Sequence, residues 1–212
     1  MLKNLIFDLG DVIIPIDMGA PIRNFAELAG LPVEEVTALW KQHNLWLQYE
    51  TGLVDDDGFR QGVRQLMQQH DLPTNEAWTD EIIDTAWNTI LLDLPVERVD
   101  RILELKASGR YRLFLLSNTN AIHIRQVNQM LMALDRPALP NLFERVFLSH
   151  EIRMAKPAPD IYDYVLRETG IAAAETAFFD DNAANIAAAA VLGIQAVHVV
   201  PPKTILEYTA HL

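Results

Sequence analysis

Four short segments of this 212-residue chain carry polar side chains directly after an apolar run or just ahead of a helix-like pattern. In an open α/β sheet such places are the carboxyl ends of the strands, where ligands bind. Together the segments offer a carboxylate, hydroxyl and amide donors, an ammonium ion and an adjacent pair of carboxylates. This set predicts a phosphate-handling site built from residues 6–12, 115–120, 154–157 and 178–182.

Asp8 is the candidate nucleophile, because it comes directly after the apolar run 5–7. A carboxylate fixed there can attack phosphorus in line and form an acyl phosphate that water then hydrolyses. The structural alternative is that Asp8 is a turn residue ahead of Gly10.

Asp180 and Asp181 are the candidate metal ligands, since they follow the apolar residues 178–179. Aspartates commonly cap helices, and a helical pattern follows, so capping is the alternative. Two adjacent carboxylates repel each other, however, and a cation removes that repulsion. Hard oxygen ligands beside a phosphate favour Mg²⁺, and Asp8, a backbone carbonyl and waters could complete its octahedron.

The phosphoryl oxygens need donors, and Ser117, with Asn118 and Thr119 after it, could supply a hydroxyl and N–H groups. Helix capping is again the alternative for these residues. Lys156, ahead of Pro157, could pair with the nucleophile and the phosphate as a compact point charge. In isolation it would be a solvated loop lysine.

Three further polar residues lie near the ends of these segments. Asn185, one helical turn after Asp181, could orient a metal-bound water or face solvent. The histidines show no metal-binding spacing. His123 and His150 lie close to the motif ends and could touch a substrate, but we interpret both as structural.

Short continuous apolar runs, which suit parallel strands covered on both faces, must position these groups. Helix-like segments separate the last four runs, and strand–helix alternation of this kind predicts a Rossmann-like, doubly wound α/β sheet. The predicted strands are 5–7, 112–116, 145–148, 176–179 and 195–200, and the predicted helices are 96–108, 121–134, 159–169 and 182–192.

The stretch 17–92 interrupts this alternation, because its apolar residues recur only at helical spacing. We expect a four-helix insert there, with turns at 30–32, 51–52, 55–57 and 71–73. The predicted domains are therefore a core formed by 1–16 and 93–212 and a helical cap formed by 17–92.

Composition narrows the classes of partner. Half of the residues are hydrophobic, as in a globular protein with a sizeable core. The formal net charge is −12, and this negative charge argues against nucleic acid and anionic membranes as binding partners. The chain has no cysteine, which fits a cytoplasmic location. A phosphate site on so acidic a protein must be made attractive locally, by a cation, a lysine and N–H groups. The oligomeric state is left open.

In these four motifs the chain resembles the haloacid dehalogenase superfamily of aspartate-nucleophile phosphohydrolases, over nearly its whole length. The matching residues are 7–12, 116–118, 156–157 and 179–182. The amino-acid sequence of these motifs is most similar to the bacterial sugar-phosphatase branch, which includes α-glucose-1-phosphate phosphatases. The insert stands where that family carries a helical cap.

The resemblance implies a Mg²⁺-dependent phosphatase acting on a small phosphorylated metabolite such as a sugar phosphate. It implies Asp8 as nucleophile and metal ligand, Ser117 and Lys156 as phosphate binders, and Asp180 or Asp181 as metal ligand. The carbonyl of Gly10 would be another ligand. It also places Trp46, Tyr49 and Glu50 in the cap, where they could contact the substrate.

Gly10 departs from the family pattern, in which a second aspartate protonates the leaving alcohol. Losing a positioned general acid typically costs on the order of 10²–10⁴-fold in rate. Asp11 would point away from Asp8 in an extended chain. Three outcomes stay open: a substrate with a good leaving group, such as a sugar 1-phosphate; a water or substrate hydroxyl beside Gly10; or a catalytically weak protein that only binds phosphorylated ligands. A 2-haloacid dehalogenase is a further alternative.

Overall fold

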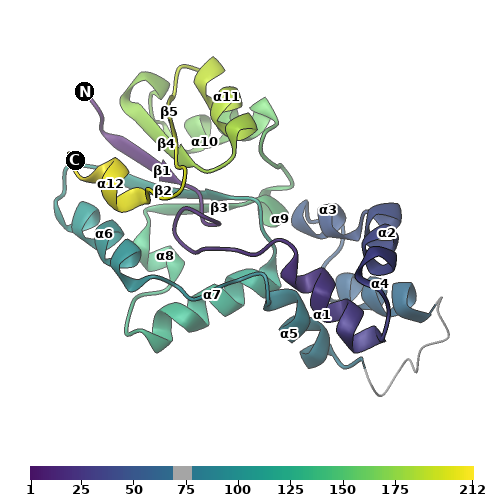
Figure 1. Cartoon of the computed structure of the whole chain (residues 1–212). Helices are drawn as coiled ribbons and strands as arrows, with labels where there is room; N and C mark the ends of the chain where they lie inside the picture. The colour runs from purple at the N-terminus through teal and green to yellow at the C-terminus, as the bar shows by residue number, and fades with distance from the viewer. Residues whose placement is uncertain (69–77) are drawn as a thin grey trace.

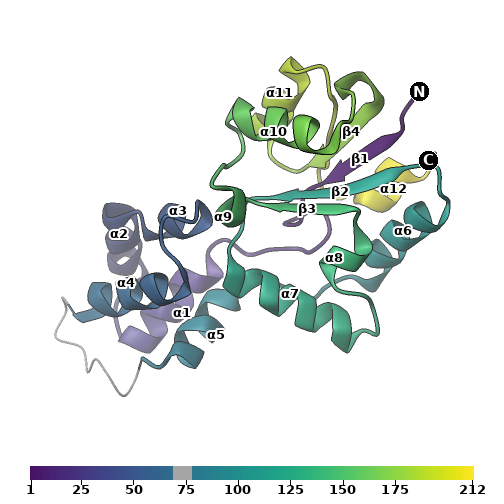
Figure 2. The same cartoon turned by 180° about the vertical axis from the view of Figure 1, so that it is seen from behind.

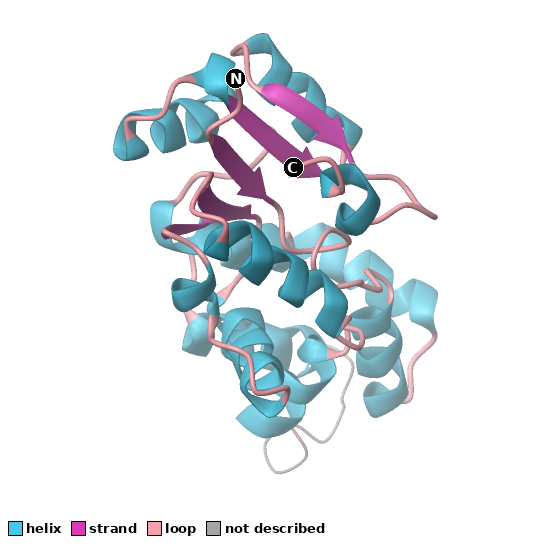
Figure 3. Ribbon diagram, turned by 90° about the vertical axis from the view of Figure 1, so that its left-hand side faces the viewer, coloured by secondary structure: helices cyan, strands magenta, loops and turns pink. Residues whose placement is uncertain are grey.

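Five parallel strands form one sheet in the order β3-β2-β1-β4-β5 in this computed structural model, which describes residues 1–68 and 78–212. Each strand overlaps a run predicted from the sequence, so the predicted doubly wound α/β sheet is confirmed. Figure 3 shows the sheet and the helices around it. The strands are β1 Asn4–Phe7, β2 Arg112–Ser117, β3 Arg145–Leu148, β4 Thr176–Asp180 and β5 Gln195–His198.

Helices cover both faces of the sheet (Figures 1 and 2). The helices α10 and α11 pack on one face, and α6, α7, α8 and α12 pack on the other. There are two further short elements: α9 directly follows β3, and the 3₁₀ helix η1 directly precedes β4. Their bounds are α6 Val96–Ala107, α7 Ala121–Ala133, α8 Leu139–Leu142, α9 Ser149–Ile152, α10 Pro159–Thr169, η1 Ala173–Glu175, α11 Ala183–Val191 and α12 Ile205–Thr209.

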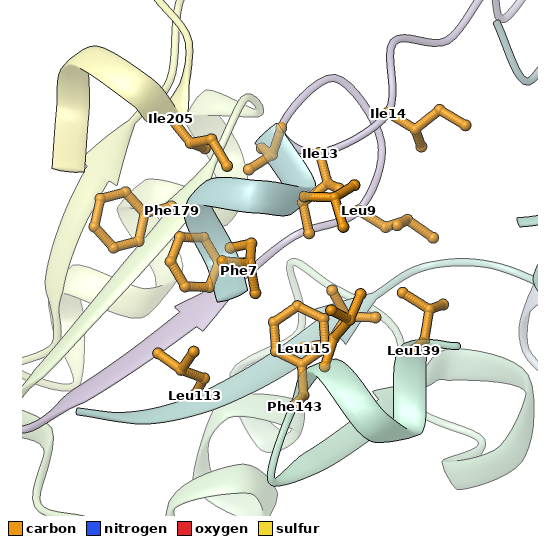
Figure 4. Packing of buried hydrophobic residues seen from close by; sticks show 14 of the residues in the cluster. Phe7, Leu9, Ile13, Ile14, Leu113, Leu115, Leu139, Phe143, Phe179 and Ile205 are labelled. Carbon is orange, nitrogen blue, oxygen red and sulfur yellow. The ribbon is translucent and has the colours of Figure 1, made fainter. Parts of the chain in front are cut away.

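The apolar runs form strands because alternate side chains can be buried on opposite faces. Phe7 pairs in register with Leu115 and Phe179, and all three enter the cluster under α6 and α7. Figure 4 shows these side chains together, and the rings of Phe7 and Phe179 are stacked at 4.9 Å. Their neighbours Ile6 and Phe178 face the opposite cluster under α10 and α11.

A second group of helices, α1 to α5, lies beyond the carboxyl ends of the strands (Figures 1 and 2). Its buried side chains form their own hydrophobic cluster, to which Ile122 of α7 is added. Trp87 lies at its centre, stacked on Trp40 at 5.7 Å and met edge-on by Trp46 at 4.6 Å. The bounds are α1 Ala20–Ala29, α2 Val33–His43, α3 Leu45–Glu50, α4 Asp56–Gln68 and α5 Asp80–Asn88.

The structure has five helices in the described part of this stretch, where four were expected. The additional one, α3, spans six residues, which is too short for a clear helical period. The expected turn at 55–57 is in part the first turn of α4, which Asp55 caps through the N–H of Gly58 at 2.8 Å. The expected turn at 71–73 lies outside the described residues.

Two neighbouring segments connect these helices to the rest of the chain. Ile16 and Leu91 form an antiparallel bridge. The N–H of Asp17 donates to the carbonyl of Ile90 at 2.8 Å, and the N–H of Leu92 donates to that of Pro15 at 3.1 Å. The chain therefore leaves and re-enters the core at one place, side by side.

Among the described residues, none of the helices combines the length and the apolar composition needed to cross a lipid bilayer.

In the sheet, β1 lies between β2 and β4, where the direction of chain winding reverses. Ligands of open α/β sheets bind outside the carboxyl ends of the strands at such a point.

Candidate active site

The Asp8 carboxyl lies one residue beyond β1, at the place in the sheet where the direction of chain winding reverses. Its N–H donates to the carbonyl of Phe179 at 2.9 Å, which extends the pairing of β1 with β4 by one residue. Its Oδ1 accepts the N–H of Leu9 at 2.7 Å and lies 2.8 Å from the Nζ of Lys156. Asp8 lines a cavity of about 310 Å³ between the sheet and the helices α1 to α5.

Lys156 is a buried cation between two carboxylates. Its Nζ lies 2.8 Å from Asp8 Oδ1 and 2.7 Å from Asp180 Oδ2. Its backbone is held by the side chain of Asn118, which accepts the Lys156 N–H at 2.9 Å and donates to the Lys156 carbonyl at 2.9 Å. Sequence reasoning placed Asn118 only among the substrate contacts and missed this role.

Asp180 is fully buried, and its oxygens are occupied by protein donors. Besides Lys156, it accepts the N–H of Asn182 at 2.8 Å and the Nδ2 of Asn185 at 2.9 and 3.1 Å. Asn185 therefore orients Asp180 and does not face solvent. Asp181 is half-buried, and its carboxyl lines the cavity.

Helix capping does not account for the candidate polar residues. The N-cap of α11 is Asn182, whose side chain accepts the N–H groups of Ala184 and Asn185. The N-cap of α7 is Asn120, whose side chain accepts the N–H of His123. The carboxylates and Ser117 are thus free of the capping role that the sequence left open.

One carboxylate oxygen from each of Asp8, Asp180 and Asp181 lies within 4.8 Å of the others. Oxygen ligands at this spacing fit a hard divalent cation. Gly10 also lines the cavity; its carbonyl accepts the N–H of Val12 at 2.6 Å and retains a second lone pair. The donor set therefore fits Mg²⁺, with Asp181 the carboxylate least engaged by the protein.

The electrostatics of the site also favour a cation. The pKa of Asp8 is raised to about 7, because burial and the charge of Asp180 outweigh the attraction of Lys156. Burial and Asp180 likewise raise the pKa of Asp181. Three carboxyls share one ammonium ion, so a divalent cation would balance the remaining negative charge.

The space beside Gly10 is occupied by Ile16. A Cβ built on Gly10 would lie 3.1 Å from the Ile16 Cδ1, so a longer side chain at this position would be crowded. Asp11 has a positive φ of 52°, and its Oδ1 accepts the N–H of Ile16 at 3.1 Å. Asp11 is exposed and committed to the loop backbone.

Ser117, at the end of β2, lines the cavity, and its hydroxyl makes no hydrogen bond within the described chain. Thr119 also lines it, with its backbone held by the Ser149 hydroxyl, which accepts the Thr119 N–H at 2.9 Å and donates to its carbonyl at 3.1 Å. The short helix α9 thereby shapes the loop that carries Thr119, a contribution that the sequence did not indicate.

The three candidate substrate contacts from the predicted cap lie in different surroundings. Glu50 lines the cavity. Tyr49 is buried, and its hydroxyl donates to Asp56 at 2.5 Å and accepts the N–H of Ile122 at 3.2 Å. Trp46 packs on Trp87 and does not line the cavity. Contact of Tyr49 or Trp46 with a substrate stays a prediction.

His123 has the structural role expected of it. Its Nδ1 accepts from the Asn120 amide at 2.9 Å, and its Nε2 faces the carbonyl of Trp87 at 3.2 Å. Burial lowers the pKa of His123 to about 4. This neutral ring joins α5 to α7, and it also forms part of the cavity wall.

The amino-acid sequence is similar to those of known phosphatases. The chain is 28% identical over 195 residues to D-ribitol-5-phosphate phosphatase of Bacteroides thetaiotaomicron, covering 92% of this chain and 90% of that protein. It is 31% identical over 155 residues to a sesquiterpene phosphatase of Aspergillus oryzae, covering 73% of this chain and 71% of that one.

Among solved structures, a haloacid dehalogenase family enzyme from B. thetaiotaomicron, in complex with magnesium and inorganic phosphate, superposes with a TM-score of 0.85. It shares 32% identity and covers 98% of this chain and 99% of its own. The family model for haloacid dehalogenase-like hydrolases matches residues 2–193. The resemblance of the four motifs is thereby confirmed, and the chain belongs to the haloacid dehalogenase-like hydrolases.

Proposed function

We propose that this protein is a Mg²⁺-dependent phosphatase that hydrolyses a small phosphorylated metabolite, such as a sugar or polyol phosphate. The observation that carries the proposal is the group formed by Asp8, Asp180 and Asp181, whose oxygens lie within 4.8 Å of one another beside the ammonium ion of Lys156. The relatives named as phosphatases support the reaction class.

In this proposal Asp8 attacks the phosphorus and becomes an aspartyl phosphate, which water then hydrolyses. Lys156 and Ser117 bind the phosphoryl oxygens as negative charge develops. Asn118 holds Lys156 in place, and Asn185 orients Asp180. Bound Mg²⁺, held by Asp8, Asp181 and the Gly10 carbonyl, would neutralise phosphoryl charge.

We further propose that residues 1–16 and 93–212 act as the catalytic core and that 17–92 act as its cap. The cavity of about 310 Å³ lies between them, at the lower end of the range of roughly 300–1,000 Å³ for small-molecule sites. Its size favours a compact metabolite. Cap closure would exclude bulk water during the reaction.

The test is release of inorganic phosphate from a panel of sugar, polyol and aryl phosphates, with Mg²⁺ and with a chelator. We expect turnover that chelation abolishes. Asp8→Asn should reduce kcat on the order of 10⁴–10⁶-fold while leaving the protein folded. Asp163→Asn, an exposed aspartate of α10, is the matched control and should retain full activity.

Two results would contradict the proposal. Phosphate binding with no turnover of any panel member would identify a phospholigand-binding protein. Metal-independent halide release from a 2-haloacid would identify a dehalogenase.

A further inference from the structure

The carboxyls that line the active-site cavity, among the described residues, are Asp8, Asp11, Glu50 and Asp181. Asp8 and Asp181 belong to the nucleophile and the cation site. Asp11 is tied to the backbone N–H of Ile16. Glu50 is the carboxyl in this cavity to which the proposed reaction gives no role, and it is carried by the cap.

Contacts with the core hold Glu50 in place through the residues on either side of it in the chain. The preceding residue, Tyr49, accepts the N–H of Ile122 from α7 at 3.2 Å. Two residues later, Gly52 lies directly against the carbonyl of His150, leaving no room for a Cβ. The end of α3 is thus fixed against the core at both flanks, so Glu50 is held at the cavity with little freedom to withdraw.

The surroundings of Glu50 favour a carboxyl that can hold a proton. Burial raises the pKa of Glu50 to about 6, while a hydrogen bond from Trp46 and the charge of Lys156 lower it. The Trp46 ring is itself fixed edge-on against Trp87 at 4.6 Å. A carboxyl with a pKa near the working pH is suited to proton transfer.

A general acid is what this site otherwise lacks. Gly10 has no side chain, and Ile16 lies beside it, so neither can donate a proton to a leaving alcohol. Glu50 lines the same cavity as Asp8 but comes from the cap, so its carboxyl could serve the leaving-group side of a phosphate ester that Asp8 attacks from the core.

We propose that Glu50 is a catalytic residue, the general acid and base of this enzyme, acting from the cap in place of the carboxyl missing at Gly10. The proposal rests on the phosphatase function proposed above. In the first step a bond forms between Asp8 and phosphorus, the bond from phosphorus to the leaving oxygen breaks, and Glu50 gives its proton to that oxygen.

The second step returns the site to its starting state. Water adds its oxygen to phosphorus, the bond from Asp8 to phosphorus breaks, and the Glu50 carboxylate takes the proton that the water releases. The products are an alcohol and inorganic phosphate, and no further reactant is needed.

The test is a series of leaving groups with wild-type protein and Glu50→Gln, which keeps the shape of the side chain. For D-ribitol 5-phosphate, whose alkoxide is a poor leaving group, we expect kcat/KM to fall on the order of 10²–10⁴-fold. For 4-nitrophenyl phosphate, whose phenolate leaves without a proton, we expect a fall of less than about 10-fold, because the lost acid acts mainly on basic leaving groups.

Matched variants separate this role from effects on folding. Glu34→Gln, an exposed carboxyl on cap helix α2, should change neither activity. Glu50→Ala should repeat the selective loss, and Glu50→Asp should recover part of the activity on the alkyl phosphate. Circular dichroism and thermal melting identify any variant that fails to fold. The variants that do fold then decide whether Glu50 acts as the general acid.

Equal losses on both substrates, or no loss on either, would overturn the role of Glu50 and leave the phosphatase function intact. So would a loss specific to the alkyl phosphate in Asp11→Asn, or a wild-type protein that hydrolyses only the aryl phosphate. If wild-type protein with Mg²⁺ hydrolyses no member of the phosphate panel described above, the phosphatase function itself is wrong.

Discussion

Lys156 neutralises part of a buried group of carboxylates, and its position depends on one amide side chain. The paired hydrogen bonds from Asn118, both 2.9 Å, fix the loop that carries Lys156. A small shift of the ammonium ion would change its distance to both Asp8 and Asp180. Displacements of about 1 Å in such sites can cost on the order of 10²-fold in rate.

We therefore expect Asn118→Ala to lower kcat/KM about 10- to 100-fold, because Lys156 loses its fixed position. The loss of two hydrogen bonds should also lower the free energy of unfolding by about 1–3 kcal/mol. Steady-state kinetics and urea unfolding measure the two effects. Asn141→Ala, at an exposed position of α8, is the control; equal activity in the two variants would show that Asn118 does not position Lys156.

His123 makes stability depend on pH. Burial lowers its pKa from the ordinary 6.5 to about 4, so the unfolded chain binds a proton first as the pH falls. The stabilisation is complete above about pH 6.5 and decreases toward pH 4, by about 3 kcal/mol in total. Protonation would also place an N–H on Nδ1 against the Asn120 amide donor.

The free energy of unfolding, measured with urea between pH 7.5 and 4, should therefore fall less steeply in His123→Gln than in the wild-type protein. An identical slope in the two proteins would mean that other groups carry the acid sensitivity.

The grouping of the main polar residues of the candidate site could be predicted from the sequence, because each one directly follows an apolar run or precedes a helix-like pattern. Asp8, Ser117, Lys156 and Asp181 all line one cavity. Their partners could not be predicted, since the contacts depend on side-chain geometry across long separations. Asn118 and Lys156, for example, are 38 positions apart.

At the scale of elements, the strands were predictable because parallel strands buried on both faces have continuous apolar runs. The short helix α3 was not, because six residues give too little periodicity and its place depends on tertiary contacts. That helix carries Glu50 to the cavity. The element hardest to predict is therefore the one that links the proposed cap to the candidate site.

The contact between Gly52 and α9 can be tested with a matched pair of glycines. Gly52 has a φ of +66° and abuts the His150 carbonyl, whereas Gly30 has a φ of +64° with open space around it. Gly30→Ala should show only the cost of the left-handed backbone, about 1–2 kcal/mol. Gly52→Ala should cost roughly 1–3 kcal/mol more, because the added methyl group displaces α3 from the core.

Urea unfolding measures both glycine variants, and phosphatase assays should show a loss of about 10²-fold for Gly52→Ala alone. Equal stability and activity in the two variants would mean that the cap does not depend on this contact.

At the scale of the whole molecule, the acidic character of the chain makes cation binding a source of stability. The net charge is −12, and three carboxyls meet at the active site. A ligand that binds only the folded state stabilises it by about 2.7 kcal/mol at 100 times its Kd. Saturating Mg²⁺ should therefore raise Tm by roughly 5–10 °C in a chain of this size.

Asp181→Asn should remove most of that Tm increase, and Asp163→Asn should keep it. Differential scanning calorimetry with Mg²⁺ and with a chelator makes the comparison. An undiminished increase in Asp181→Asn would place the stabilising ion elsewhere on the protein.

The paired segments at Ile16 and Leu91 have a consequence for how this architecture can be rebuilt. Because the two crossings are adjacent, a tight reverse turn could replace the intervening stretch, which includes the described helices α1 to α5, without moving any strand of the sheet. Such an excised core would retain Asp8, Lys156 and Asp181 but lose Glu50 together with the wall that limits ligand size. It would become an indiscriminate catalyst for activated phosphates, and a different module grafted at the same two positions would supply both a new proton donor and a new choice of substrate.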